Sequence, residues 1–285
     1  MDTAVPLPKS DRMPDTTSSS IMANDVWVEH PRGRIFARVW TPEGGARAVA
    51  PDRPIVLFHD SLGSVELWRD FPAGLSAATG RRVIAYDRLG FGRSDPRADS
   101  LDPATFIADE APSFFPALRE QLGVRRFIAF GHSVGGGMAV HCAAEFPADC
   151  EALITESAQV FPEDRTLDAI RVAKEQFKDD SQVGRLRKYH GDKARWVLDA
   201  WTDSWLHPEF ADWSLAPVLP RVTCPVLAIH GIHDEYGTTR HPELIGQLSG
   251  GPARVEIIPD TYHVPHRERP ELILDLVSGF VAALR

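Results

Sequence analysis

The sequence predicts an α/β fold with a mostly parallel eight-stranded sheet, helices on both faces, and a helical cap inserted after the sixth strand. Short apolar runs alternate with stretches of helical pattern from about residue 26 to the end of the chain. Parallel strands need a crossover connection, which is usually a helix, so this alternation favours a parallel sheet. Only one long segment, at about 161–215, contains no good strand, and it is long enough to form the cap.

The strands are predicted one by one from their patterns. Residues 26–30 and 34–41 alternate in polarity around Pro31 and Gly33, which indicates a hairpin. Six further runs are short and apolar and end at polar turns, as buried parallel strands do: 54–59, 82–86, 126–131, 152–155, 225–230 and 254–258. The helices expected between and after them cover 66–79, 104–122, 134–146, 239–248 and 269–284, with 167–177 and 194–205 in the cap.

Composition is ordinary for a globular protein and limits the function classes. Of the 285 residues, 43% are hydrophobic and 25% charged, so a sizeable core can form. Residues 1–23 are rich in Pro, Ser, Thr and Asp, and we expect a disordered extension before a single domain over 24–285. The net charge of −9 disfavours binding to nucleic acid or to an anionic membrane surface.

The three cysteines do not suggest a disulfide framework. Their number is odd, and Cys142, Cys150 and Cys224 each lie in or beside an apolar stretch, which is typical of small buried side chains. No segment is long and apolar enough to span a bilayer, and no signal-peptide core is recognisable. We therefore expect a cytoplasmic protein, and the sequence leaves homo-oligomerisation open.

The strongest chemical signal is Gly131-His132-Ser133-Val134-Gly135, which lies between a predicted strand and a predicted helix. A tight strand-to-helix turn lifts a serine hydroxyl above the sheet, and glycines on either side avoid steric clashes in it. The N–H groups that follow stand at a helix N-terminus, where they can stabilise an oxyanion. Ser133 is thus the predicted nucleophile.

A serine nucleophile needs a base and an orienting acid. His263 follows the last predicted strand and is the favoured base, with His266 as its rival. Asp234 follows the strand 225–230 and is the favoured acid, with Glu235 and Glu156 as alternatives. The resulting order along the chain is serine, acid, histidine.

The remaining site residues are predicted from the loop after strand 54–59 and from the cap. The backbone N–H groups of Ser61 and Val134 are the expected oxyanion donors. Aromatic residues with helix-like spacing in the cap serve either to pack the cap on the body or to line an apolar pocket. The pocket residues we expect are His59, Asp60, His132, Trp196, Trp201 and Trp205.

With these motifs in hand, the chain resembles the α/β-hydrolase fold superfamily over about residues 26–284. Beside the serine turn, 86–96 (YDRLGFGRSDP) is similar to the D-x-x-G-x-G-x-S stretch of that family. Residues 231–238 (GIHDEYGT) resemble its acid loop, and 259–273 (PDTYHVPHRERPELI) its histidine segment. Two positions depart from the pattern: Asp60 stands where the oxyanion loop usually has glycine, and Tyr262 replaces the glycine before the histidine.

The resemblance implies hydrolysis of a small carboxylic ester, lactone or thioester through an acyl-enzyme, without cofactor or metal. The expected substrate is a small molecule with an apolar or aromatic acyl part. Alternatives with the same catalytic residues are a carbon–carbon bond hydrolase of ring-cleavage products and a cofactor-free perhydrolase or haloperoxidase. A non-catalytic ligand-binding protein on the same fold is the alternative from a different class.

Overall fold

The computed structural model describes residues 20–43 and 53–284 and contains one eight-stranded sheet in the order β1-β2-β4-β3-β5-β6-β7-β8. β3 to β8 pair in parallel, whereas β2 runs antiparallel to both of its neighbours, β1 and β4. The mostly parallel sheet predicted from the sequence is therefore confirmed. Its strands are β1 (Ile21–Val28), β2 (Ile35–Pro42), β3 (Ile55–Phe58), β4 (Val83–Tyr86), β5 (Phe127–His132), β6 (Cys150–Glu156), β7 (Val226–Gly231) and β8 (Ala253–Ile258).

The first strand begins earlier than predicted. β1 starts at Ile21 rather than at residue 26, so residues 21–23, which we had assigned to the extension, belong to the sheet. Ile21 pairs with Pro42 and Ala23 with Trp40. Pairing along β2 stabilises this mixed, largely exposed segment, whereas its own sequence shows no clear alternation of polarity. Residues 1–19 of the predicted extension lie outside the described residues.

The helices match the predicted segments, but two of these segments are divided. Residues 66–79 form a short 3-10 turn (Val65–Trp68) before α1, and 104–122 pass through a π-helical turn (Glu110–Phe114) before α2. Pro112 and Pro116 lack an N–H group and so prevent a regular α-helix there. The helices of the body are α1 (Phe71–Thr79), α2 (Phe115–Gln121), α3 (Val134–Glu145), α7 (Arg240–Leu248), α8 (Pro265–Glu268) and α9 (Pro270–Ala282).

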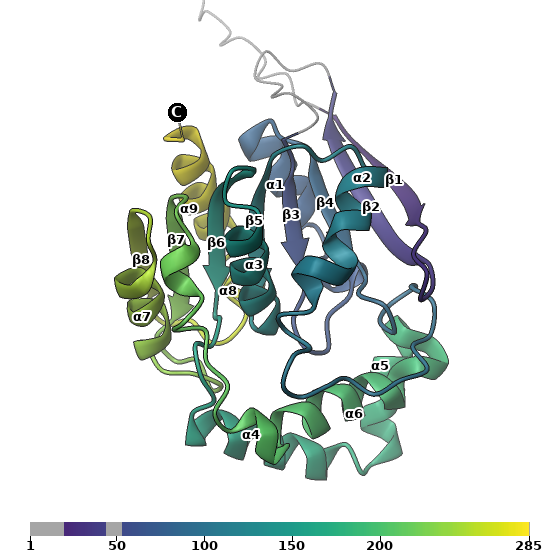
Figure 1. Cartoon of the computed structure of the whole chain (residues 1–285). Coiled ribbons are helices and arrows are strands. Elements are labelled where there is room, and N and C mark those ends of the chain that lie inside the picture. Colours follow the sequence, from purple (N-terminus) through teal and green to yellow (C-terminus); the bar gives the residue numbers. More distant parts are fainter. Residues whose placement is uncertain (1–19, 44–52, 285) are drawn as a thin grey trace, which may run out of the picture.

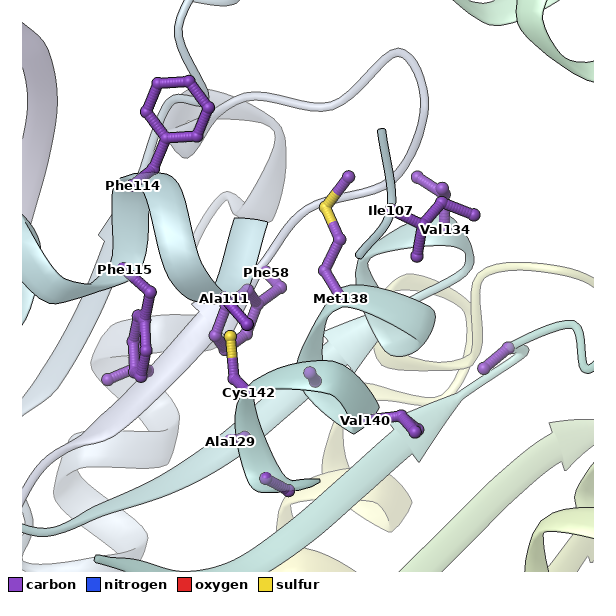
Figure 2. Close-up of a cluster of buried hydrophobic side chains, with 14 of the residues drawn as sticks. Phe58, Ile107, Ala111, Phe114, Phe115, Ala129, Val134, Met138, Val140 and Cys142 are labelled. Atoms are coloured by element: carbon purple, nitrogen blue, oxygen red, sulfur yellow. The ribbon is translucent and has the colours of Figure 1, made fainter. Parts of the chain in front are cut away.

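The core consists of two apolar layers, one on each face of the sheet. Because side chains alternate along a strand, Val56 and Phe58 of β3 enter one layer and Leu57 enters the other. The layer on the side of α2 and α3 includes Phe58, Met138 and their neighbours (Figure 2). α1 and α9 pack against each other and cover the opposite face (Figure 1). The sheet is thereby fixed from both sides.

The segment between β6 and β7, for which the sequence predicts a cap, is helical. It contains α4 (Asp164–Gln176), α5 (Asp180–His190) and α6 (Ala194–Trp205), which gather beyond the carboxyl ends of the parallel strands (Figure 1). α5 was not singled out in the sequence because its pattern is mostly charged, yet Val183 and Leu186 on it are buried. None of the helices within 20–43 and 53–284 is long and apolar enough to cross a membrane.

Candidate active site

Ser133 occupies a strained turn between β5 and α3. Its backbone has φ 55° and ψ −125°, a conformation that side-chain-bearing residues rarely adopt and that is often found at functional sites. A Cβ atom on Gly131 would lie 2.1 Å from the carbonyl oxygen of Gly135, and one on Gly135 would lie 2.1 Å from that of Phe58. The two glycines that flank the serine are therefore required by close backbone contact.

His263 and the buried Asp234 form a pair in the loops that follow β8 and β7. The Nδ1 atom of His263 lies 2.9 Å from both carboxylate oxygens of Asp234, which follows β7. The carboxylate also accepts the backbone N–H of Tyr236 at 2.7 Å. Although burial raises the pKa of Asp234, the neighbouring His263 outweighs it and the net pKa is lowered. An ionised Asp234 thus orients the ring and leaves Nε2 free to act as a base.

The alternative acid and the rival base bind each other instead. Glu156, at the end of β6, accepts the backbone N–H of His266 at 2.8 Å and contacts its Nδ1 atom at 2.5 Å. Both side chains are almost fully buried. Glu235, the other alternative acid, is exposed to solvent. The geometry therefore favours Asp234 and His263 over every alternative considered.

Ser133 and His263 line the same cavity, but within the described residues their side chains form no hydrogen bond with each other. Such bonds are often long or poorly aligned in ligand-free enzymes and tighten when substrate binds. The Ser133 side chain is only slightly exposed, at the floor of the cavity. Ser133 and His263 come from different loops, and both can contact a small ligand in the cavity.

The two expected oxyanion donors are free. Val134 is the first residue of α3, where the N–H group has no partner within the helix. Ser61 lies in the turn after β3, and its N–H group donates to no acceptor among the residues the structure describes. Both residues line a small recess beside the main cavity. A carbonyl oxygen of a ligand attacked by Ser133 has two donors available there.

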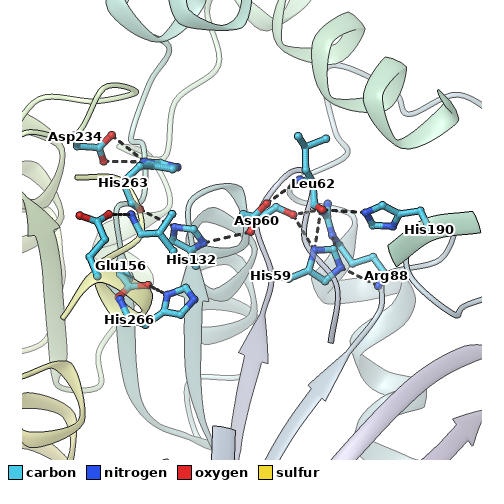
Figure 3. Close-up of polar contacts among 12 residues, drawn as sticks. His59, Asp60, Leu62, Arg88, His132, Glu156, His190, Asp234, His263 and His266 are labelled. Carbon is cyan, nitrogen blue, oxygen red and sulfur yellow. Dashed lines mark hydrogen bonds and ion pairs between the residues drawn. The ribbon is translucent and has the colours of Figure 1, made fainter. Parts of the chain in front are cut away.

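Asp60, the unusual residue of the oxyanion loop, is held by two contacts (Figure 3). One carboxylate oxygen accepts the backbone N–H of Leu62 at 2.8 Å, and the other lies 3.5 Å from Nδ1 of His132. Burial opposes the charge on His132, but Asp60 and Glu156 together raise its pKa to about 9. The pKa of Asp60 is lowered, chiefly by His132 and against the effect of burial. An ion pair therefore joins the oxyanion loop to the residue before the nucleophile.

His59 does not line the cavity, contrary to our expectation. Its Nδ1 atom lies 2.8 Å from the carbonyl oxygen of Asp60, and Nε2 accepts the backbone N–H of Arg88 at 3.1 Å. The guanidinium of Arg88 also donates to the Asp60 carbonyl at 2.8 Å. Burial lowers the pKa of His59, so it is a neutral side chain that supports the oxyanion loop from below.

The cavity has a volume of about 250 Å³ and lies between the body and the cap. Of the predicted pocket residues, Asp60, His132, Trp201 and Trp205 line it. Trp196 does not: it packs on Phe91 and borders a separate cavity. Five residues along a helix correspond to about 500°, so Trp196 lies roughly 140° around α6 from Trp201. Lining residues that the sequence did not reveal include Leu62, Gln159, Ile170, Arg185, Leu186, Tyr236 and Arg267.

His132, Glu156 and His266 place three ligand-type atoms within 4.8 Å of one another. Each of these side chains already has protein partners: Glu156 binds His266, and His132 contacts Asp60 and the carbonyl oxygen of His263 at 2.8 Å. Hydrogen bonding between buried side chains accounts for the cluster without an ion.

Comparisons with known proteins show what the chain as a whole is similar to. A family model described as the alpha/beta hydrolase fold matches residues 53–180. A non-heme chloroperoxidase of Streptomyces lividans is 29% identical over 235 residues, which cover 70% of this chain and 79% of that protein. A bifunctional esterase/perhydrolase of Acinetobacter calcoaceticus is 34% identical over 116 residues, and this match covers 40% of this chain and only 37% of that protein.

A solved structure shows the same fold. The enol-lactonase of Burkholderia xenovorans LB400 superposes with a TM-score of 0.68 at 20% identity, covering 90% of this chain and 100% of that one. At this identity the likeness concerns the fold alone.

Proposed function

Because a family model of the alpha/beta hydrolase fold matches residues 53–180, we propose that this chain is a serine hydrolase that cleaves a small carboxylic ester, lactone or thioester. The observation that carries the proposal is the strained turn at Ser133, which lines the same cavity as His263, the partner of the buried Asp234. A glycine-rich turn with only a structural role does not require an imidazole held in position in the same cavity.

The reaction follows from these positions. Nε2 of His263 takes the proton of Ser133 as the hydroxyl attacks the carbonyl carbon, and Asp234 stabilises the imidazolium. The N–H groups of Ser61 and Val134 hold the oxyanion of the tetrahedral intermediate. His263 then passes the proton to the leaving group, and water activated by the same histidine releases the acid from Ser133.

The lining of the cavity supports an apolar or aromatic acyl part. Leu62, Ile170 and Leu186 supply aliphatic surface, and Trp201 and Trp205 supply aromatic surface. The cavity is smaller than those that hold drug-sized ligands, so the substrate is small.

Acyl transfer to hydrogen peroxide is a second candidate, favoured by the similarity to a chloroperoxidase and to an esterase/perhydrolase. It uses the same acyl-enzyme, with peroxide in place of water as the attacking group. Peracid formation during ester turnover in the presence of peroxide distinguishes this activity from simple hydrolysis.

The test is a series of p-nitrophenyl esters of increasing acyl length, assayed with the wild type and with Ser133→Ala. We expect turnover of the short esters by the wild type and a loss of several orders of magnitude in Ser133→Ala, with unchanged thermal unfolding. A vinylogous diketone assayed in parallel tests for carbon–carbon bond cleavage. Wild-type-like ester turnover in purified Ser133→Ala overturns the proposal.

A further inference from the structure

Two arginines line the active-site cavity without a hydrogen-bonded partner among the described residues, and Arg185 has a longer-range electrostatic interaction with Asp179. Arg185 comes from α5 of the cap and Arg267 from α8 of the body. Both side chains are exposed, and neither guanidinium forms a hydrogen bond or ion pair with another of the described residues. Most of the other described arginines are bound to carboxylates or carbonyl groups, as Arg34 and Arg119 are.

The other ionised groups at the cavity either are paired with an opposite charge or lie behind the cavity lining. Asp60 is paired with His132, whose raised pKa of about 9 keeps the imidazole protonated at neutral pH. The ionised Asp234 is buried behind His263. The charges that line the cavity without a hydrogen-bonded partner among the described residues are therefore the two guanidinium groups, although the chain as a whole carries a net charge of −9.

We propose that the substrate carries a free carboxylate, distant from the bond that is cleaved, which Arg185 and Arg267 bind at the mouth of the cavity. This inference rests on the proposed function, since it assigns a substrate class to the same site. A guanidinium matches a carboxylate in geometry and can donate two parallel hydrogen bonds to it. The apolar side chains that line the same cavity then hold the acyl chain.

The position of the two arginines suggests how the carboxylate acts on the cap. One guanidinium belongs to the cap and the other to the body, so a carboxylate between them links the two parts. Local positive charge on an otherwise acidic surface also attracts anionic substrates toward this cleft in preference to the rest of the molecule. Neutral esters of the same length can neither link the cap to the body in this way nor be attracted by the positive charge.

The experiment compares two p-nitrophenyl esters of one chain length: the adipate half ester, which ends in a carboxylate, and its terminal carboxamide. Spontaneous hydrolysis is subtracted for each. We expect the wild type to prefer the carboxylate ester by about tenfold or more in kcat/KM, the effect of one charge-assisted hydrogen bond. Arg185→Gln and Arg267→Gln should each reduce this preference about tenfold, mainly through KM.

Arg187→Gln is the matched control, because Arg187 is an exposed arginine on the same helix that does not line the cavity. It should leave the preference unchanged. The inference alone is overturned if the carboxamide ester is cleaved as well as the carboxylate ester, or if Arg187→Gln acts like Arg185→Gln. If the wild type cleaves neither ester, the proposed function fails and the inference falls with it.

Discussion

Two histidines stand three residues apart near the C-terminal end of the chain, and each has its own buried carboxylate. His263 is paired with Asp234 and faces the cavity, whereas His266 is paired with Glu156 and packs against Trp68. Burial lowers the pKa of His266, although Glu156 opposes this effect. The first pair is therefore placed for proton transfer and the second for holding β6 to the histidine segment.

The two pairs predict different outcomes on substitution. His263→Ala should fall to the activity of Ser133→Ala, and the double variant should fall no further, because the residues act as a unit. His266→Ala removes the imidazole partner of the buried Glu156, which keeps only the backbone N–H of residue 266, and should lower stability by up to about 3–5 kcal/mol while the folded fraction stays active. Ester kinetics and denaturant unfolding measure both effects. An inactive, stable His266→Ala beside an active His263→Ala would reverse the assignment.

Substitutions of Asp60 provide a separate test at the level of a single residue. In Asp60→Asn the side-chain oxygen still accepts the Leu62 N–H, so most activity should remain. Asp60→Gly loses this bond and the contact with His132 and should lower kcat/KM by roughly tenfold through a poorly placed Ser61 N–H. Both are measured on one good ester. Unchanged values in both variants, within about twofold, would mean that Asp60 is a bystander.

Among the elements, the cap is attached to both catalytic loops. At the start of α4, Glu163 accepts the N–H and hydroxyl of Thr238, the last residue of the acid loop. At the end of α5, His190 accepts the Gly92 N–H on Nδ1 at 2.8 Å, so Nε2 carries the proton and donates to the carbonyl oxygen of Leu62 at 3.0 Å (Figure 3). The position of the oxyanion loop therefore depends on the docking of α5.

His190→Ala should loosen this contact. It leaves the Gly92 N–H and the Leu62 carbonyl without a partner, at about 1–3 kcal/mol for each buried group. We expect faster amide exchange in α5 and around Leu62, together with a lower kcat/KM for esters. His207→Ala, which removes an exposed histidine elsewhere in the cap, is the control. Unaltered exchange around Leu62 would show that the oxyanion loop is held without α5.

Across the whole molecule, the raised pKa of His132 links stability to pH. A histidine with a pKa of about 9 in the folded state and about 6.5 when unfolded contributes its full stabilisation below pH 6.5. This contribution is lost as the pH rises toward 9, because the folded state must keep a proton that the unfolded chain releases. The opposing trend, from buried neutral histidines such as His59, acts only as the pH falls below about 6.5.

Unfolding by guanidinium at pH 7.0, 7.75 and 8.5 measures this linkage. The wild type should lose up to about 1.4 kcal/mol of stability per pH unit through His132. In His132→Gln this part of the slope should disappear, while any loss from buried thiols remains in both proteins. Equal slopes in wild type and variant would show that His132 is neutral in the folded state.

The parts of the molecule that could be predicted are those encoded locally. The strand, glycine spacing and helix around Ser133 lie within a short segment, and the same holds for the strands that precede Asp234 and His263. The start of β1 and the existence of α5 depend on tertiary contacts that compensate for weak local patterns. The Asp60–His132 pair also depends on tertiary structure, because its members are far apart in the sequence. The same is true of the side chain of Trp196, which borders a separate cavity instead of the active site.

The most direct test of the central claim is covalent labelling of the folded protein with a fluorophosphonate, followed by mass spectrometry of its peptides. The account predicts one label per chain, located on Ser133, because His263 activates this hydroxyl and the Ser61 and Val134 N–H groups bind the phosphonyl oxygen. Labelling should be lost in Ser133→Ala and strongly slowed in His263→Ala. A folded wild type that takes up no label, or takes it up on another residue, would contradict the assignment of Ser133 as the nucleophile.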